Sequence, residues 1–232
     1  MKVLITGATG FVGTALCARL ARDGHQPLAL SRDPERAKRR VPALAGVWAW
    51  DPEREYAPAE AFDGVDGVVH LAGESVTGRW TPEKKRRIYD SRVQGTRHLV
   101  GTMAKLDRKP QALVSSSAIG YYGERGDDVL DEGQPPGDDF LAEVCQAWEA
   151  EAARAGEAGV PTARVRTGIV LGRGGGALAQ MLLPAKLGVS GPLGSGRQWW
   201  SWVHLDDLTG LIVHALERRA DGPLNAAAPG AV

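Results

Sequence analysis

The sequence predicts an α/β protein built on a doubly wound parallel sheet with helices on both faces. Segments with strand and helix patterns alternate along the chain, and a glycine-rich turn joins the first strand to the first helix. The predicted strands lie near residues 2–6, 26–31, 46–50, 66–71, 111–116 and 161–167. The predicted helices lie near residues 11–22, 34–40, 81–106, 138–155, 176–187 and 206–218.

Length and composition are those of an ordinary globular domain. The chain has 232 residues, of which 43% are hydrophobic and 24% charged, enough for a sizeable core. Lys plus Arg and Asp plus Glu are equal at 28 each, so the charge favours neither nucleic acid nor a membrane surface as a partner. No apolar run approaches the roughly 20 residues of a membrane span. Since the chain enters a core strand at once, we expect no signal peptide and a cytoplasmic location.

The first strand and helix are joined by the run VLITGATGFVG at residues 3–13. Gly7 permits the tight turn, Gly10 lets the backbone approach a pyrophosphate, and Gly13 lets the helix lie close to the strand. Phosphates would then meet the unpaired N–H groups at the helix N-terminus. An ordinary strand–turn–helix is the alternative, but the position at the first turn favours a Rossmann-type nucleotide site. The expected contacts are Gly7, Thr9, Gly10, Phe11, Val12 and Gly13.

The second strand ends in Ser31 and Arg32, which are both expected to contact the cofactor. Arg32 lies 19 positions after Gly13, where an NAD site offers an acid to the ribose hydroxyls. A guanidinium at that position can hold a 2′-phosphate through paired hydrogen bonds. The sequence therefore favours NADP(H), and a solvated arginine ahead of a charged helix is the alternative.

The fourth strand ends in small residues that let the backbone approach the adenosine half of the cofactor. Its expected contacts are Leu71, Ala72, Gly73 and Glu74. His70 is interpreted as a strand residue without a catalytic role.

The next helix begins with Thr81 as its N-cap and Pro82 at its first position. Its basic run at residues 84–87 indicates a solvated face, with a nucleic-acid patch as the weaker alternative. Arg92, further along, is expected to reach the cofactor.

The fifth strand carries the candidate catalytic residues. Ser117 at its carboxyl end can hydrogen-bond a substrate carbonyl or hydroxyl oxygen, and Ser115 is expected to contact the cofactor. Tyr121 and Tyr122 follow directly and are the candidate proton donors, because a nearby cation such as Arg125 can lower a tyrosine pKa. Structural roles at a strand end and beneath a loop are the alternatives.

The run TGATGFVG resembles the extended short-chain dehydrogenase/reductase superfamily. That superfamily uses a Tyr-x-x-x-Lys pair on the helix after the fifth strand, but none of the four tyrosines here has Lys four residues on. If Glu149 is matched to the acidic residue usual in that helix, Leu141 takes the Tyr position and Cys145 the Lys position. The usual proton relay is therefore absent.

Several motifs together narrow the resemblance. They are HLAGE at 70–74, SSAIGYYG at 116–123, DFLAEVC at 139–145, RTGIVLG at 166–172 and WSWVHLDD at 200–207. In combination they resemble an atypical NADP-binding, epimerase-like branch, short-chain dehydrogenase/reductase family 39U. The resemblance implies that Arg166 lies near the nicotinamide, and that His204 and Asp207 brace the fold and cap a helix. It also implies a longer substrate lobe, so residues 1–167 are expected to form the NADP-binding domain and 168–232 a partial lobe interleaved with the last sheet elements.

These observations predict an NADP(H)-dependent oxidoreductase or epimerase of a small polar substrate, without a metal. The alternative is a non-catalytic NADP(H)-binding module that senses redox state. The long helices at 81–106 and 138–155 are candidates for a homodimer interface. The glycine-rich stretch 172–176 is interpreted as a lid hinge, with a phosphate cradle as the alternative; a second such stretch spans 188–196.

Overall fold

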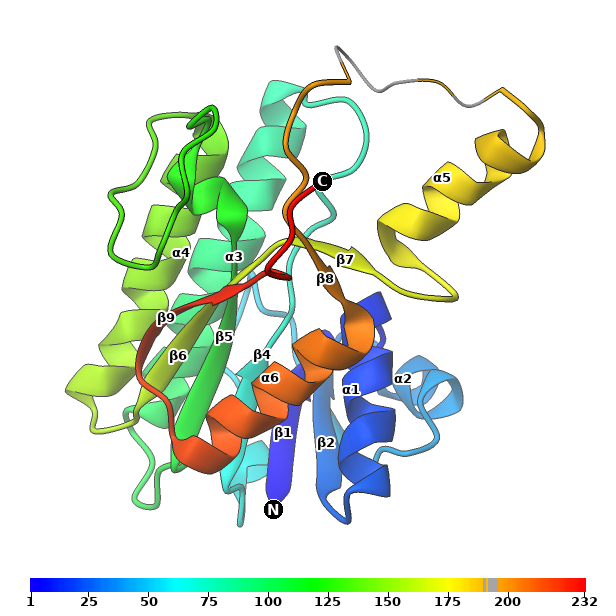
Figure 1. Cartoon of the computed structure of the whole chain (residues 1–232). Coiled ribbons are helices and arrows are strands. Elements are labelled where there is room, and N and C mark those ends of the chain that lie inside the picture. Colours follow the sequence, from blue (N-terminus) through cyan, green and yellow to red (C-terminus); the bar gives the residue numbers. More distant parts are fainter. Residues whose placement is uncertain (190, 192–195) are drawn as a thin grey trace.

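A seven-stranded parallel sheet forms the centre of the protein (Figure 1). The computed structural model describes residues 1–189, 191 and 196–232, so the predicted glycine-rich stretch at 188–196 lies partly outside the described residues. The strand order is β3-β2-β1-β4-β5-β6-β9. The strands are β1 (Lys2–Thr6), β2 (Gln26–Ser31), β3 (Gly46–Ala49), β4 (Gly67–His70), β5 (Ala112–Ala118), β6 (Thr162–Thr167) and β9 (Gly222–Ala226). This order is doubly wound, as predicted.

Six α-helices and two short 3-10 helices accompany the sheet in the described part of the chain. They are α1 (Phe11–Arg22), α2 (Pro34–Arg40), η1 (Ala59–Phe62), α3 (Pro82–Met103), η2 (Ile119–Tyr122), α4 (Phe140–Glu157), α5 (Gly176–Lys186) and α6 (Leu205–Arg218). Every predicted helix is present, with ends shifted by no more than about three residues, which is the usual uncertainty of helix ends.

Alternate residues of the strands point to opposite faces of the sheet and belong to two separate hydrophobic cores. Val3 and Ile5 of β1 pack in the core that also contains residues of α1 and α6, whereas Leu4 packs with residues of α3. Consequently α3 and α4 cover one face of the sheet, and α1 and α6 cover the other (Figure 1). The strand order reverses between β1 and β4, which opens a crevice at their carboxyl ends.

Side chains cap four of the helices in the described chain, and the caps at Thr81 and His204 are as predicted. At the start of α2, Asp33 accepts from the Arg36 amide at 2.9 Å. Thr81 accepts from the Lys84 amide at the start of α3, Asp139 from the Ala142 amide at α4, and His204 from the Asp206 amide at α6. Each cap satisfies one backbone donor that the helix itself leaves unpaired.

Two short strands, β7 (Ile169–Leu171) and β8 (Trp202–His204), form a second sheet that the sequence did not reveal. Three residues are too few for an alternating pattern to be recognised. Residues after 167 also form β9, a strand of the main sheet, and α6, which packs against that sheet. The division into two domains at residue 167 stays a prediction. No helix in the described residues is long and apolar enough to cross a membrane.

Candidate functional site

The glycine turn occupies the crevice between β1 and β4. Gly7 has a φ of +70°, and a Cβ there would lie 2.8 Å from the carbonyl carbon of Leu71. A Cβ on Gly13 would lie 2.8 Å from the Cα of Ala8. At Gly10, a Cβ would meet the Gly7 carbonyl oxygen, at 3.2 Å, and no other atom of the described residues within 4 Å. Gly7 and Gly13 are therefore required by the fold, whereas Gly10 leaves the start of α1 open for a ligand.

The N-terminus of α1 fits an anionic ligand. Gly10 is its N-cap and supplies no side-chain hydrogen bond, and the first turn of the helix contains no acidic residue. The backbone N–H groups of this turn and the helix dipole are the elements that hold phosphate groups in dinucleotide folds.

A cavity of about 530 Å³ begins at this turn and extends over the ends of β5 and β6 to α4. The predicted site residues that line it are Gly7, Gly10, Phe11, Val12, Gly13, Leu71, Arg92 and Ser117. The predicted site residues outside its lining are Thr9, Ser31, Arg32, Ala72, Gly73, Glu74, Ser115, Tyr121, Tyr122 and Arg166. The structure thus brings the glycine turn and one of the three candidate catalytic residues to a common space.

A buried hydrogen-bond chain fixes the floor of the crevice. Thr96 donates to the Arg92 carbonyl at 2.6 Å, so its hydroxyl oxygen accepts from Nε2 of His70 at 3.0 Å. Nδ1 of His70 then accepts from Thr6 at 2.7 Å, and the Thr6 oxygen accepts from the Leu71 and Ala72 amides. This arrangement requires neutral His70, in agreement with the predicted non-catalytic role. Burial and, to a smaller extent, the charge of Arg92 lower the pKa of His70 to about 4.

Protonation of His70 should make folding pH-dependent. Between pH 6.5 and about pH 4, His70 is protonated in the unfolded chain but stays neutral in the folded chain. We therefore expect the free energy of unfolding to fall by roughly 3 kcal/mol on acidification through this window. Urea denaturation of the wild type and of His70→Gln at pH 7 and pH 4 measures the effect. The same substitution at the exposed His214 is the control and should leave the pH dependence unchanged. An equal pH dependence in the wild type and His70→Gln would contradict the assignment.

The turn after β4 is attached to α3 at Glu74. The Glu74 amide donates to Ser91 at 2.9 Å, and its carbonyl accepts from Nη1 of Arg92 at 3.0 Å. Its carboxylate pairs with Lys84 at 2.5 Å, and the hydrogen bond from Lys84 lowers the pKa of Glu74. Part of the basic run at 84–87 therefore serves this contact.

At the end of β2, Ser31 and Arg32 differ in their surroundings. The Ser31 hydroxyl is engaged locally, since it donates to the Asp33 carbonyl at 3.1 Å and accepts from the Asp33 amide. Arg32 is exposed beside it. The arginine side chain therefore faces solvent, at the edge where the sequence analysis expects the adenosine ribose.

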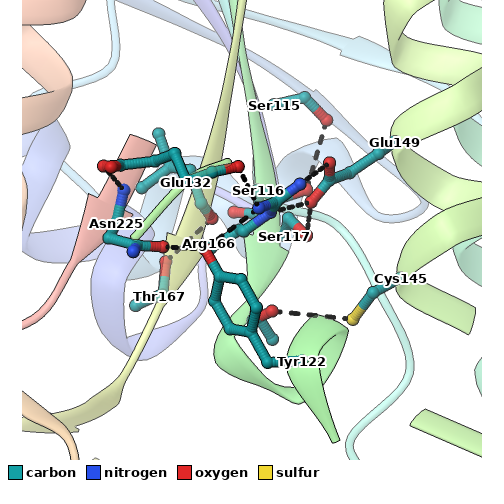
Figure 2. Close-up of polar contacts among 12 residues, drawn as sticks. Ser115, Ser116, Ser117, Tyr122, Glu132, Cys145, Glu149, Arg166, Thr167 and Asn225 are labelled. Carbon is teal, nitrogen blue, oxygen red and sulfur yellow. Dashed lines mark hydrogen bonds and ion pairs between the residues drawn. The ribbon is translucent and has the colours of Figure 1, made fainter. Parts of the chain in front are cut away.

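Ser117 belongs to a buried ionic network (Figure 2). Its hydroxyl donates to Oε1 of Glu149 at 2.7 Å, and Glu149 accepts two hydrogen bonds from Arg166, at 2.8 and 2.9 Å. Ser117, Glu149 and Arg166 are 4%, 8% and 3% exposed. Burial by itself lowers the pKa of Arg166, but the hydrogen bonds and charge of Glu149 raise it well above its usual range. Arg166 therefore presents its side chain to Glu149 and not to the cavity.

The two candidate tyrosines lie in the same network. The Tyr122 hydroxyl donates to Oδ1 of Asn225 at 2.6 Å and accepts from Nη1 of Arg166 at 3.0 Å (Figure 2). The guanidinium of Arg166 lies 3.5 Å from the centroid of the Tyr121 ring. Because Tyr122 is only 3% exposed and its hydroxyl already has two partners, the geometry argues against its predicted role as proton donor. For Tyr122 the alternative, packing beneath a loop, agrees better with these contacts, whereas the role of Tyr121 stays a prediction.

The positions that the missing Tyr-x-x-x-Lys pair would occupy face the cavity. Leu141 and Cys145 line it, together with Trp148 one turn further along α4. Burial raises the pKa of the Cys145 thiol to about 11, and its Sγ lies 3.8 Å from the Ala118 carbonyl oxygen. The two positions of the usual proton relay thus carry a leucine and a cysteine whose thiol stays protonated near neutral pH.

Sequence reasoning did not identify Glu149 and Trp148 as site residues. A charged residue on the inner face of an amphipathic helix was the available signal for Glu149. The 172–176 loop lies over Phe11, since a Cβ on Gly175 would be 2.6 Å from its ring, and the hinge and phosphate-cradle interpretations both stay predictions.

The strand order, the glycine turn and the crevice at the strand ends define a dinucleotide-fold protein of Rossmann type. The chain belongs to the NAD dependent epimerase/dehydratase family, whose sequence model matches residues 3–227. The resemblance drawn from the motifs is confirmed by two of its relatives. "Epimerase family protein SDR39U1 homolog, chloroplastic" of Arabidopsis thaliana is 41% identical over all of this chain and 67% of its own length. "Epimerase family protein SDR39U1" of Homo sapiens is 38% identical over 99% of this chain and 75% of its own length.

Solved structures agree with this assignment. The crystal structure of human SDR39U1 (isoform 2) with NADPH matches with a TM-score of 0.87 and 37% identity, over 99% of this chain and 75% of that one. A nucleoside-diphosphate sugar epimerase from Corynebacterium glutamicum matches with a TM-score of 0.83 and 38% identity, over all of this chain and 47% of that one.

Proposed function

We propose that the chain binds NADP(H) and catalyses hydride transfer, as an oxidoreductase or epimerase, on a small polar substrate. The observation that carries the proposal is the single cavity that joins the glycine turn to Ser117 at the end of β5. The human relative crystallised with NADPH supports the choice of cofactor. When bound, the cofactor supplies or accepts the hydride.

The residues present fit a dinucleotide. The open start of α1 at Gly10 suits the pyrophosphate, and the exposed Arg32 suits a 2′-phosphate. The carboxylate of Glu74 is already paired with Lys84, so it does not present an unpaired negative charge to the nucleotide.

Ser117 would orient the substrate as a hydrogen-bond acceptor. Its proton is donated to Glu149, so its oxygen retains lone pairs for a substrate hydroxyl but has no proton for a carbonyl oxygen. This geometry favours binding of the alcohol form of the substrate.

The test is a fluorescence titration with NADPH and NADH in parallel. We expect wild type to prefer NADPH, and Arg32→Gln to bind NADPH about 10- to 100-fold more weakly with NADH unchanged, which corresponds to one charged hydrogen bond. Arg36→Gln, at an exposed arginine of α2, is the matched control. Equal binding of the two nucleotides by wild type would contradict the NADP(H) proposal, and no binding of either would refute the function.

A second function is favoured by the apolar residues at the relay positions. Leu141 and Cys145 in the cavity would suit an NADP(H)-binding module that senses redox state without turnover. This function requires unequal affinity for NADPH and NADP⁺. Equal affinity, or hydride exchange with any carbonyl or sugar substrate, would refute it.

Two further parts of the proposal concern the whole molecule. A homodimer would use α3 and α4, which lie side by side on one face of the sheet (Figure 1). Light scattering would measure its mass. A cytoplasmic location is proposed as well, and cell fractionation would test it.

A further inference from the structure

The wall of the cavity formed by α3 and α4 is largely apolar but contains two side chains with N–H donors, Arg92 and Trp148. Arg92 is the one charged side chain that lines the cavity in the described structure. Trp148 lines it too and is 5% exposed, and its Nε1 is buried without a hydrogen-bond partner in the part of the chain described. Cys145, one turn before Trp148, lines the cavity as well, but its thiol already donates to the Ala118 carbonyl oxygen at 3.8 Å.

The Arg92 side chain is fixed by two hydrogen bonds from Nη1, and its other nitrogen atoms can still donate. Its Nη1 donates to the carbonyl oxygens of Glu74, at 3.0 Å, and Ile88, at 3.2 Å. These are its only hydrogen bonds to described residues, so Nε and Nη2 remain as donors. The guanidinium carbon lies 5.1 Å from the centroid of the Trp148 ring, which places the two groups together in the wall. Burial lowers the pKa of Arg92, and the charges of Cys145 and Glu74 oppose that shift.

The wall has donors without matching acceptors. No carboxylate lines the cavity within the described chain, and Val144, Leu141 and Ile88 contribute apolar surface to the same cavity. An unsatisfied donor in such surroundings is costly, and native structures rarely retain one without a reason. The group that would satisfy this wall is an acceptor with negative charge.

We infer that Arg92 and Trp148 form a subsite for a carboxylate group of the substrate. This inference rests on the proposed function, because it assigns the α3–α4 wall to the substrate and the glycine turn to the cofactor. It replaces the expectation from the sequence that Arg92 contacts the cofactor, and NADPH binding by Arg92→Gln decides between the two assignments. A carboxylate matches one guanidinium and one indole N–H in charge and in number of acceptors, and its remaining atoms meet an apolar wall. A phosphate dianion would need more donors than this wall offers.

Benzoate and its neutral isostere benzamide are suitable probes for calorimetric titration of the full chain saturated with NADPH. We expect benzoate to bind at least about tenfold more tightly than benzamide, as one charged hydrogen bond requires. Arg92→Gln should remove that preference, and Trp148→Phe, which deletes only the indole N–H and part of the ring, should weaken benzoate several-fold. Arg86→Gln and Trp80→Phe, at exposed positions of α3 and the preceding loop, are the controls and should keep it.

Thermal unfolding and NADPH titration of each variant separate this inference from the proposed function. A folded Arg92→Gln variant that binds NADPH normally but no longer prefers benzoate supports the subsite. Equal binding of benzoate and benzamide by wild type would overturn it while leaving NADPH binding intact. Competition between benzoate and NADPH, with weaker NADPH binding by Arg92→Gln, would also overturn it, since the wall would then serve the cofactor. If wild type binds benzoate but no nucleotide, the proposed function fails and the carboxylate subsite stands.

Discussion

Replacing Glu149 by glutamine is expected to lower the free energy of unfolding by about 3–5 kcal/mol, because it leaves the buried Arg166 guanidinium without a countercharge. The carboxylate accepts two hydrogen bonds from Arg166 and one from Ser117, and all three side chains are less than a tenth exposed. Glutamine keeps the shape but offers one acceptor oxygen. Urea denaturation at pH 7 measures the loss, and a two-state transition in both proteins makes the comparison valid.

The matched control lies on the same helix. Glu151 pairs with Arg97 and Arg154, whose side chains are 48% and 55% exposed, so Glu151→Gln should cost about 1 kcal/mol or less. Changing both buried partners, Glu149→Leu with Arg166→Met, should recover part of the loss, since no unpaired charge is then left. Equal small losses at 149 and 151 would mean that the network does not hold the fold.

The second large effect is expected at the glycine turn, where two alanine substitutions should separate folding from nucleotide binding. Gly13→Ala places a Cβ against backbone atoms of Gly7 and Ala8, which cannot move cheaply, so we expect a loss of about 1–3 kcal/mol in stability together with lost NADPH binding. Gly10→Ala meets only one oxygen, at 3.2 Å, and should change stability by less than about 1 kcal/mol. Its methyl group would occupy the space of the pyrophosphate, so NADPH binding should weaken by about 100-fold or more.

Denaturation and NADPH titration of both variants measure the two quantities. Gly156→Ala is the control: this glycine lies in α4, and no atom of the described residues is within 4 Å of an added Cβ. Alanine there should slightly stabilise the helix. Normal NADPH affinity in Gly10→Ala would contradict the prediction that the pyrophosphate binds at the start of α1.

Local patterns in the sequence were sufficient for six strands of the main sheet and for all six α-helices. The cap at Thr81, the positive φ of Gly7 and the contact of Gly13 with Ala8 each depend on residues close in the sequence, so their roles can be inferred from spacing alone. The strands β7 and β8 are three residues each and gave no such pattern.

The site divides in the same way. The glycine turn and the absence of the Tyr-x-x-x-Lys pair are properties of single segments, and the sequence determined both. The hydroxyl group of Tyr122 donates to Asn225, 103 residues away, and that of Ser117 donates to Glu149, 32 residues away. The sequence alone could not predict either partner. Arg92 and Trp148, on different helices, likewise meet only because α3 and α4 pack on the same face of the sheet. The sequence by itself therefore determined the fold class, the helix caps and the nucleotide turn, because these follow from short-range backbone geometry. Only the tertiary structure decided which polar side chains are buried as partners and which face the cavity, since that depends on contacts between distant segments.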